Sequence, residues 1–590
     1  EFGWSLPAGE GPFGAAPLAS LLGQAGLGWA KLPVWYDAHD NQESERIAWF
    51  AEQLSIQGIE LVGVLDQPPK ELRQVFREEG RLPVASVFAE PELWEPAVSP
   101  VLTRLSLRIR WWQLGEDQDT SFVGMPQAEA KIGEIRRRLE QYGQELRLGV
   151  GWRWLHPTPE LRLDDRPPWS FLSYNAEPAL TAAELSTYLA PAGPAEVKAA
   201  SKTLDSSLQR RSHTPRPGWS AQVAPPSAVA SWVMLSPLAR EEYTLSARVQ
   251  DLAQRMLSAR VHGASAVFVP LPFDASHGLI NADGSPGELF VPWRTTATLV
   301  GGAEYLGSIQ LPGGSTCHAF GRDGQAVLAI WNEQPTTERL TLDDGVEQID
   351  VWGQNVLLPI EAQAEPQERE IAVGPLPTFL IGQSEGVARW QATVDFESLQ
   401  VASVFNVEQS INLKIRNPFN QGISGEVKLQ APASWGVDPR PTRFKIAVGD
   451  ELRLALPVTL LADANSGPQP VRLDFEITAD RNYRFSVYRT LQLGLDDVQI
   501  ELRTKLRNDG ALIVEQQLNN LSERPVSFQC LLFPQGRRRE IRQVINAQPG
   551  QTATTYILPR GEELIGQRLL LRAEEIGGPR VLNYTLTGER

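Results

Sequence analysis

The sequence predicts a multidomain α/β plus all-β protein, with a (β/α)8 TIM barrel followed by a small β domain and two β-sandwich (Ig-like) domains. Over the first part of the chain, apolar runs alternate with amphipathic stretches roughly eight times, which is typical of parallel βαβ units. No GxGxxG motif follows the first strong apolar run, so the usual dinucleotide-binding signal is missing. After Gly307, short alternating segments separated by turn residues replace the helical pattern.

Each predicted barrel element has its own justification. Apolar residues recur at helical spacing over 45–57, and Gly58 ends that helix as a C-cap glycine would. The continuous apolar run 59–65 is typical of a strand buried on both faces. Residues 191–227 are rich in Pro and Ser and carry no predicted element. The predicted strands are 28–36, 59–65, 83–88, 111–114, 146–155, 169–174, 231–235 and 264–269, and the predicted helices are 45–57, 70–79, 98–110, 127–144, 181–189, 240–261 and 291–305.

The length and composition set the number of domains. A chain of 590 residues is too long for one hydrophobic core, and roughly three or four domains are expected. Its 42% hydrophobic and 21% charged residues are ordinary for globular protein. We predict domains at 1–307, 308–385, 386–492 and 493–590, the last three with alternating strands such as 326–331, 410–415, 471–477, 498–502 and 526–532.

The charge and the hydropathy exclude some partners. A formal net charge of −16 disfavours binding to nucleic acid, whose phosphates repel acidic protein. No apolar run of about 18 residues is present, so we expect no membrane span. The two cysteines, Cys317 and Cys530, fall in different predicted domains, which disfavours a disulfide. The sequence does not indicate an oligomeric state.

The segment from Trp111 to Asp117 is the strongest functional signal. It is an apolar strand that stops at two carboxylates, and barrel enzymes keep their chemistry where strands end. A glutamate there, beside aromatic side chains, suits the general acid of a glycosidase, so Glu116 is our first catalytic candidate. The alternative interpretation is an acidic surface loop at the barrel rim.

Other polar and aromatic residues follow the predicted strands. Glu177 and Asp274 are candidates for a second catalytic carboxylate because both come after strand ends. The tryptophans near strand ends suit sugar stacking, although packing of the barrel interior explains such residues as well. The candidate substrate-binding residues are Trp35, Asp37, His39, Asp66, Trp112, Asp117, Trp154, His156, Tyr174, Asn175 and His277.

Several motifs, in their order along the chain, resemble clan A glycoside hydrolases, with family 39 and its relatives nearest. GLGWAK at 26–31 is similar to that family's first strand, and WQLGE at 112–116 resembles its fourth strand, which usually ends in Trp-Asn-Glu-Pro. The segment 268–284 resembles the eighth strand, and 326–333 with 373–381 resembles the small β domain that follows many such barrels. The resemblance covers about residues 1–385, and the last segments are loosely similar to accessory Ig-like modules.

The resemblance implies roles for single residues. Glu116 matches the family's acid/base glutamate, but Gly115 replaces the preceding asparagine and Asp117 the following proline. The seventh strand should end in a nucleophilic glutamate, and the matching position is Ser236 or its neighbour, where no carboxylate stands. Glu241 and Glu242 come five and six residues later.

The resemblance therefore leaves two functions open. One is a glycoside hydrolase that acts on a polysaccharide or oligosaccharide, with Glu116 as acid and a displaced or missing nucleophile. The other is a pseudo-glycosidase that binds or scaffolds glycans without catalysis, and in either case the β modules are compatible with attachment to a surface or polymer. We expect no cofactor and no metal, because neither HExxH nor paired cysteine spacing occurs. The resemblance also implies a bacterial protein that is secreted, periplasmic or at the cell surface, although the sequence shows no signal peptide.

Overall fold

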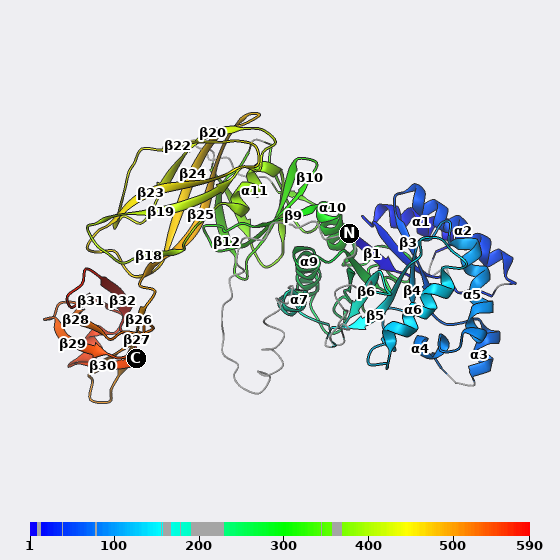
Figure 1. Ribbon diagram of the computed structural model, residues 1–590, viewed down its shortest axis with the longest axis horizontal. Helices are drawn as coiled ribbons and strands as arrows, with labels where there is room; N and C mark the ends of the chain where they lie inside the picture. The colour runs from blue at the N-terminus through cyan, green and yellow to red at the C-terminus, as the bar shows by residue number, and fades with distance from the viewer. Residues whose placement is uncertain are drawn as a thin grey trace.

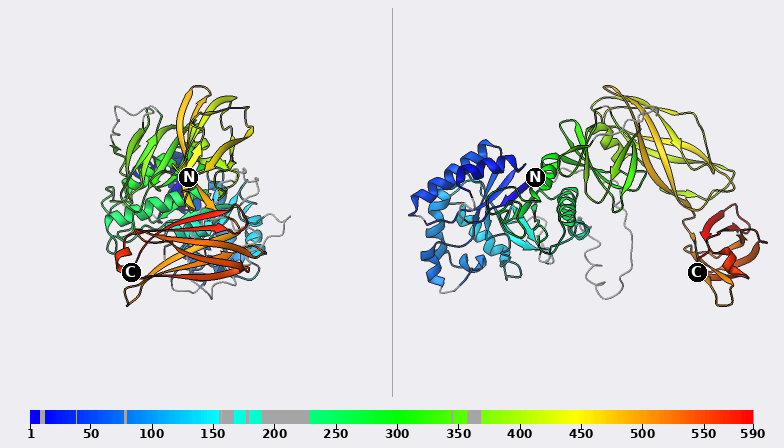
Figure 2. Two further views of the ribbon diagram at one scale, coloured as in Figure 1. Left: turned by 90° about the vertical axis from the view of Figure 1, so that its left-hand side faces the viewer. Right: turned by 180° about the vertical axis from the view of Figure 1, so that it is seen from behind.

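The computed structural model describes residues 1–8, 13–37, 39–76, 80–154, 156, 167–176, 179–189, 229–343, 345–356 and 368–589. The chain is elongated, with the barrel at one end, β-rich parts in the middle and the C-terminal sandwich at the other end (Figures 1 and 2). Eight parallel strands close into a barrel, and the last strand pairs with the first at Phe2↔Val267 and Gly3↔Phe268. This confirms the predicted fold class.

The barrel elements correct the sequence prediction at two places. The first strand is formed by Phe2–Ser5, where the sequence predicts no strand, and residues 83–88 contain a helix instead of a strand. The strands are β1 (Phe2–Ser5), β2 (Trp29–Pro33), β3 (Glu60–Leu65), β4 (Trp111–Leu114), β5 (Arg147–Arg153), β6 (Phe171–Asn175), β7 (Ala230–Met234) and β8 (Ala266–Pro270). The helices are α1 (Ala15–Gln24), α2 (Asn41–Ile56), α3 (Lys70–Phe76), α4 (Val84–Val87), α5 (Pro91–Leu105), α6 (Ala128–Leu139), α7 (Ala182–Leu189), α9 (Leu245–Val261) and α10 (Phe290–Val300).

Aromatic rings fill the interior of the barrel near its amino-terminal end. The rings of Phe171 and Trp232 stack with centroids 3.6 Å apart, and Trp29 meets Trp111 edge to face at 5.2 Å. Glycine leaves the room for these rings, since a Cβ on Gly149 would lie 2.2 Å from the Phe171 ring. The interior is therefore a packed core, and only the carboxyl ends of the strands offer surface for chemistry.

A mixed β region follows the barrel. Its six-stranded sheet has the order β14-β13-β16-β11-β10-β9, beside a two-stranded sheet of β12 and β15, and α11 (Glu385–Thr393) leads on from it. The strands are β9 (Glu304–Ser308), β10 (Thr316–Arg322), β11 (Gln325–Trp331), β12 (Thr336–Thr341), β13 (Glu347–Ile349), β14 (Asn355–Val356), β15 (Glu368–Val373) and β16 (Thr378–Ser384).

Next comes a sandwich whose core receives Trp390 from α11. The indole of Trp390 packs 5.4 Å from the Phe475 ring, which ties the helix to this sandwich. Its two sheets have the orders β17-β19-β23-β21 and β18-β25-β24-β20-β22. The strands are β17 (Asp395–Phe396), β18 (Gln400–Ala402), β19 (Glu408–Arg416), β20 (Ile423–Gln430), β21 (Trp435–Val437), β22 (Thr442–Ile446), β23 (Glu451–Leu460), β24 (Gly467–Thr478) and β25 (Asn482–Gly494).

The C-terminal sandwich pairs a three-stranded sheet with a four-stranded one. A short 3-10 helix, η1 (Gly561–Leu564), joins two of its strands. Cys317 and Cys530 are both buried and unpaired. Among the described helices, none has the length and apolar character needed to cross a bilayer. The strands are β26 (Val498–Leu506), β27 (Leu512–Asn520), β28 (Val526–Pro534), β29 (Glu540–Ala547), β30 (Gly550–Leu558), β31 (Arg568–Glu575) and β32 (Val581–Thr587).

Candidate active site at the carboxyl ends of the barrel strands

Glu116 and Asp66 lie together at the ends of two neighbouring strands. Glu116 follows β4 and Asp66 follows β3, and both carboxylates contact the guanidinium of Arg81. The same nitrogen, Arg81 Nη2, lies 2.6 Å from Glu116 Oε2 and 2.9 Å from Asp66 Oδ2, so these oxygens are at most 5.5 Å apart, the two contacts laid end to end. The structure thus brings two of the predicted site residues together.

The backbone at the end of β4 explains the direction of Glu116. Gly115 has φ +79°, a left-handed conformation that favours glycine, and a Cβ there would lie 2.9 Å from Val84 Cγ1. The following loop is held by Asp119, whose carboxylate accepts hydrogen bonds from the backbone N–H groups of Val84 (2.7 Å) and Ser121 (2.9 Å). The start of α4, which we had predicted as strand, therefore supports the carboxylate pair.

Electrostatics make Glu116 suited to hold a proton. Burial raises the pKa of Glu116; Arg81 acts in the opposite direction, and Asp66, Asp117 and Asp119 add to the rise. The Glu116 side chain is still 32% exposed, and that of Arg81 is 61% exposed. Glu116 is therefore accessible from solvent and has a raised pKa, as a general acid requires, whereas the Asp66 side chain is only 12% exposed.

A buried lysine, which the sequence reasoning missed, occupies the barrel axis. Lys31 comes from β2 and is fully buried, and its Nζ donates to Asp117 Oδ1 (2.5 Å), Gln113 Oε1 (2.9 Å) and Ser173 Oγ (2.9 Å). These three oxygens match the three N–H groups of an ammonium, and Met234 Sδ lies 3.4 Å from the same nitrogen. Burial lowers the pKa of Lys31, and the Asp117 carboxylate opposes that shift. Asp117, a predicted substrate-binding residue, is thus 7% exposed and committed to this ion pair.

The predicted tryptophans divide into core and rim residues. Trp35 is buried against Phe88 with centroids 5.5 Å apart, and Trp112 is fully buried with its indole N–H donating to Ile109 O. We do not carry these two into the proposed site, because a buried ring offers no face to a sugar. Trp154 and Tyr174 stack at 4.6 Å, and both remain partly exposed at the ends of β5 and β6.

The remaining polar candidates mostly stabilise their own turns. Asp37 accepts hydrogen bonds from the backbone N–H (2.9 Å) and Nδ1 (3.2 Å) of His39, which hold its pKa below the usual range, and the His39 side chain is 91% exposed. Asn175 Oδ1 accepts from the backbone N–H of Ala176, and His156 is exposed.

Near β7 and β8, the described chain places one of the predicted catalytic carboxylates, Asp274, in a turn after β8. Asp274 accepts hydrogen bonds from the backbone of Ser276 and from His277; burial acts to raise its pKa, but these bonds outweigh burial and lower it. At the end of β7, Leu235 is buried and Ser236 O accepts from Arg255. Glu241 and Glu242 are exposed in the turn before α9, and Glu177 lies outside the described residues.

Within the described parts of the chain, no group of three or more His, Cys, Asp or Glu side chains is arranged to hold a metal ion. The candidate site consists of the carboxylate pair and Arg81, and the stack of Trp154 and Tyr174 lies at the ends of two other strands of the same barrel.

Comparisons with known proteins show similarity of fold only. No protein-family model matches the chain, and no curated protein matches it. An α-amylase from Lactobacillus plantarum is 11% identical, with 65% of this chain and 98% of the amylase covered and a TM-score of 0.37. A calcium-binding mutant of Bacteroides uniformis β-glucuronidase 2 is 8% identical, with coverage of 100% and 65% and a TM-score of 0.30. ZgEngAGH5_4 in complex with a cellotriose is 8% identical, with coverage of 50% and 94% and a TM-score of 0.31. Likeness at this level does not identify a family.

Proposed function

We propose that this protein is a glycoside hydrolase that acts on an oligosaccharide or polysaccharide, with Glu116 as general acid/base and Asp66 as the second carboxylate. The observation that carries the proposal is that both carboxylates contact the same nitrogen, Arg81 Nη2. The separation between their contacting oxygens is therefore at most 5.5 Å. Retaining glycosidases hold their two carboxyl groups about 5–5.5 Å apart, whereas inverting enzymes leave about 6.5–9.5 Å for a water molecule.

The chemistry follows from the two environments. Glu116, whose pKa is raised, gives its proton to the glycosidic oxygen as the bond to the anomeric carbon breaks. Asp66 attacks that carbon and forms a glycosyl ester, and water then hydrolyses the ester while Glu116 takes back a proton. Arg81 bridges the carboxylates in the absence of substrate, and its exposed side chain leaves that position as the sugar enters.

A second candidate is a barrel that binds glycans without cleaving them. Two observations favour it: the buried carboxylate of Asp117 is neutralised by Lys31, and neither Leu235 nor Ser236 supplies an acid at the end of β7. In this account the rim residues contact the sugar but no bond breaks.

The experiment that separates the candidates is hydrolysis of a panel of polysaccharides and aryl glycosides by the wild type, E116Q and D66N. The proposal predicts release of sugar by the wild type and a loss of about 10²–10⁴-fold in each variant. E134Q serves as the control, because Glu134 forms an exposed pair with Arg138 on α6. Binding without release by the wild type would establish the second candidate.

A further inference from the structure

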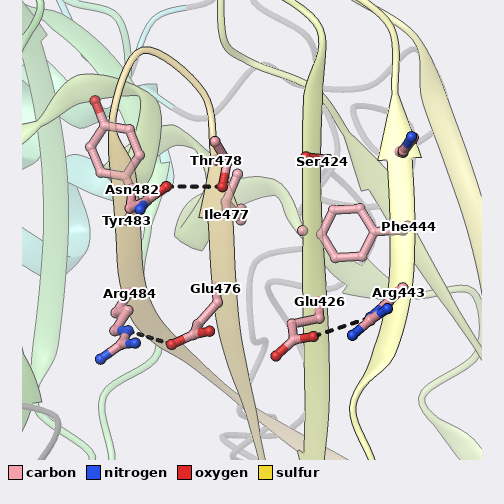
Figure 3. Close-up of a pocket in the computed structure, with 12 residues that line it drawn as sticks. Ser424, Glu426, Arg443, Phe444, Glu476, Ile477, Thr478, Asn482, Tyr483 and Arg484 are labelled. Atoms are coloured by element: carbon pink, nitrogen blue, oxygen red, sulfur yellow. Dashed lines mark hydrogen bonds and ion pairs between the residues drawn. The ribbon is translucent and has the colours of Figure 1, made fainter.

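The sandwich of residues 395–494 carries a hollow, far along the chain from the barrel. The hollow has a volume of about 630 Å³ and lies over β22, β20, β24 and β25 of its five-stranded sheet. Volumes of about 300–1,000 Å³ are typical of small-molecule sites. The side chains that point outward from these strands form two rows across the sheet (Figure 3).

The first row contains two carboxylates between two guanidinium groups. Register pairs Arg443 with Glu426, Glu426 with Glu476, and Glu476 with Arg484. Glu426 and Glu476 stand directly opposite each other, an arrangement that destabilises a sheet unless other groups compensate. Each carboxylate therefore pairs with its flanking arginine, Glu426 with Arg443 Nε at 3.6 Å and Glu476 with Arg484. The charges of this row cancel.

The second row is mainly uncharged. Ser424 faces Lys445 on one side and Thr478 on the other, and Thr478 pairs with Asn482. The Thr478 hydroxyl donates to Asn482 Oδ1 at 2.9 Å. Ser424 Oγ and Lys445 Nζ have no hydrogen-bond or ion-pair partner within the part of the chain that the structure describes. The row thus offers free hydrogen-bonding groups on rigid strands.

The side chains of the two rows determine which class of ligand the hollow can bind. The apolar residues that line the hollow, Phe444, Ile477 and Tyr483, are only 6%, 2% and 5% exposed, so they form no surface for a protein or lipid anchor. The cancelled charges of the first row give a polyanion or polycation little attraction. Hydroxyl, amide, carboxylate and guanidinium groups together suit a ligand that is neutral and rich in hydroxyl groups.

We propose that this sheet face binds a neutral polysaccharide chain, independently of the barrel site. The carboxylates of Glu426 and Glu476 accept from sugar hydroxyls, and Ser424 and Lys445 supply donors. Because the site lies on a different part of the chain, its binding does not depend on Glu116 or Asp66.

The test is affinity electrophoresis of the full chain in gels that contain laminarin, xylan or dextran as neutral polymers, with alginate and chitosan as charged ones. The proposal predicts retardation by at least one neutral polymer, which weakens about tenfold or more in E426Q/E476Q because charge-assisted hydrogen bonds are lost. The variant keeps its fold, since exposed ion pairs stabilise a protein by only about 0–1 kcal/mol. S424L, which places a larger apolar side chain in the hollow, should weaken retardation as well.

Two matched controls separate this site from the barrel. E451Q removes a carboxylate that pairs with Lys414 on the other sheet of the same sandwich, and it should leave retardation unchanged. E116Q reports how much of the retardation comes from the barrel. Retardation that is lost in E116Q but kept in E426Q/E476Q would assign the binding to the barrel and overturn the proposal, as would retardation only by alginate or chitosan, or none by any neutral polymer.

Discussion

Lys31 Nζ lies 2.5 Å from Asp117 Oδ1 inside the closed barrel, and the two side chains are fully and almost fully buried. The ammonium also donates hydrogen bonds to Gln113 Oε1 and Ser173 Oγ, which replace part of its lost hydration. Two buried ions of opposite charge stabilise each other. If one is removed, the desolvation penalty of the other is no longer compensated.

This pair predicts a pronounced non-additivity in stability. K31M and D117N should each destabilise the barrel by about 3–5 kcal/mol, because each leaves one buried charge without its partner. The double variant K31M/D117N should lie much closer to the wild type. Denaturant unfolding monitored by tryptophan fluorescence gives the cycle, and single variants whose effects simply add would contradict the buried pair.

The raised pKa of Glu116 predicts a pH-dependent gain from E116Q. A carboxyl group whose pKa is higher in the folded state holds its proton more tightly there, so its contribution to stability is largest in acid and falls as the pH rises towards the folded pKa. E116Q keeps a neutral side chain at every pH. Its melting temperature should match the wild type near about pH 4 and exceed it near about pH 8. The opposite order would show that the carboxylate is favoured in the fold.

Arg81 predicts the direction in which the pH profile moves. Its guanidinium lowers the pKa of Glu116 against the effect of burial, so R81Q should raise that pKa further. The basic limb of the activity profile, where Glu116 loses the catalytic proton, should then shift to higher pH. R136Q on α6 is the control, since Arg136 pairs with Glu140. A basic limb that stays in place in R81Q would separate Arg81 from the acid.

The stack of Trp154 on Tyr174 predicts a role in substrate binding. W154A should weaken binding of oligosaccharide by about 1–2 kcal/mol, which is roughly tenfold, because one aromatic platform at the rim is lost. The effect should appear in KM more than in kcat. Y188F is a milder change beside Trp154, because it removes only a hydroxyl group and keeps the aromatic ring, whose centroid lies 6.1 Å from that of Trp154. An unchanged KM in W154A would place this stack outside the substrate path.

The barrel was predictable because its strands are apolar runs at regular intervals, but two short elements were not. β1 has only four residues and follows no turn signal, so its sequence does not differ from that of a loop. The segment 83–88 is apolar and short, and such runs fit a strand or a buried helix equally well. The sequence prediction missed one strand, β1, and added one false strand at 83–88. The number of strands before β4 was therefore still correct, and β4 is the fourth strand as predicted.

The candidate site was predictable in its residue types but not in its pairing. Glu116 and Asp66 each follow a strand, and parallel strands bring such residues to one edge. Arg81 belongs to a connecting segment whose position depends on α4, and Lys31 appears only as one charge within the apolar segment 28–36. Lys31 does break the apolar pattern, and that single break was the available sign of a buried ion pair.

The configuration of the released sugar tests the central claim most directly. Proton NMR at the earliest time points of hydrolysis shows which anomer forms before mutarotation. The oxygens of Glu116 and Asp66 are at most 5.5 Å apart, the sum of their two contacts to Arg81 Nη2, so the account predicts retention of the substrate's anomeric configuration. Inversion, or the absence of any released sugar across the panel, would contradict it.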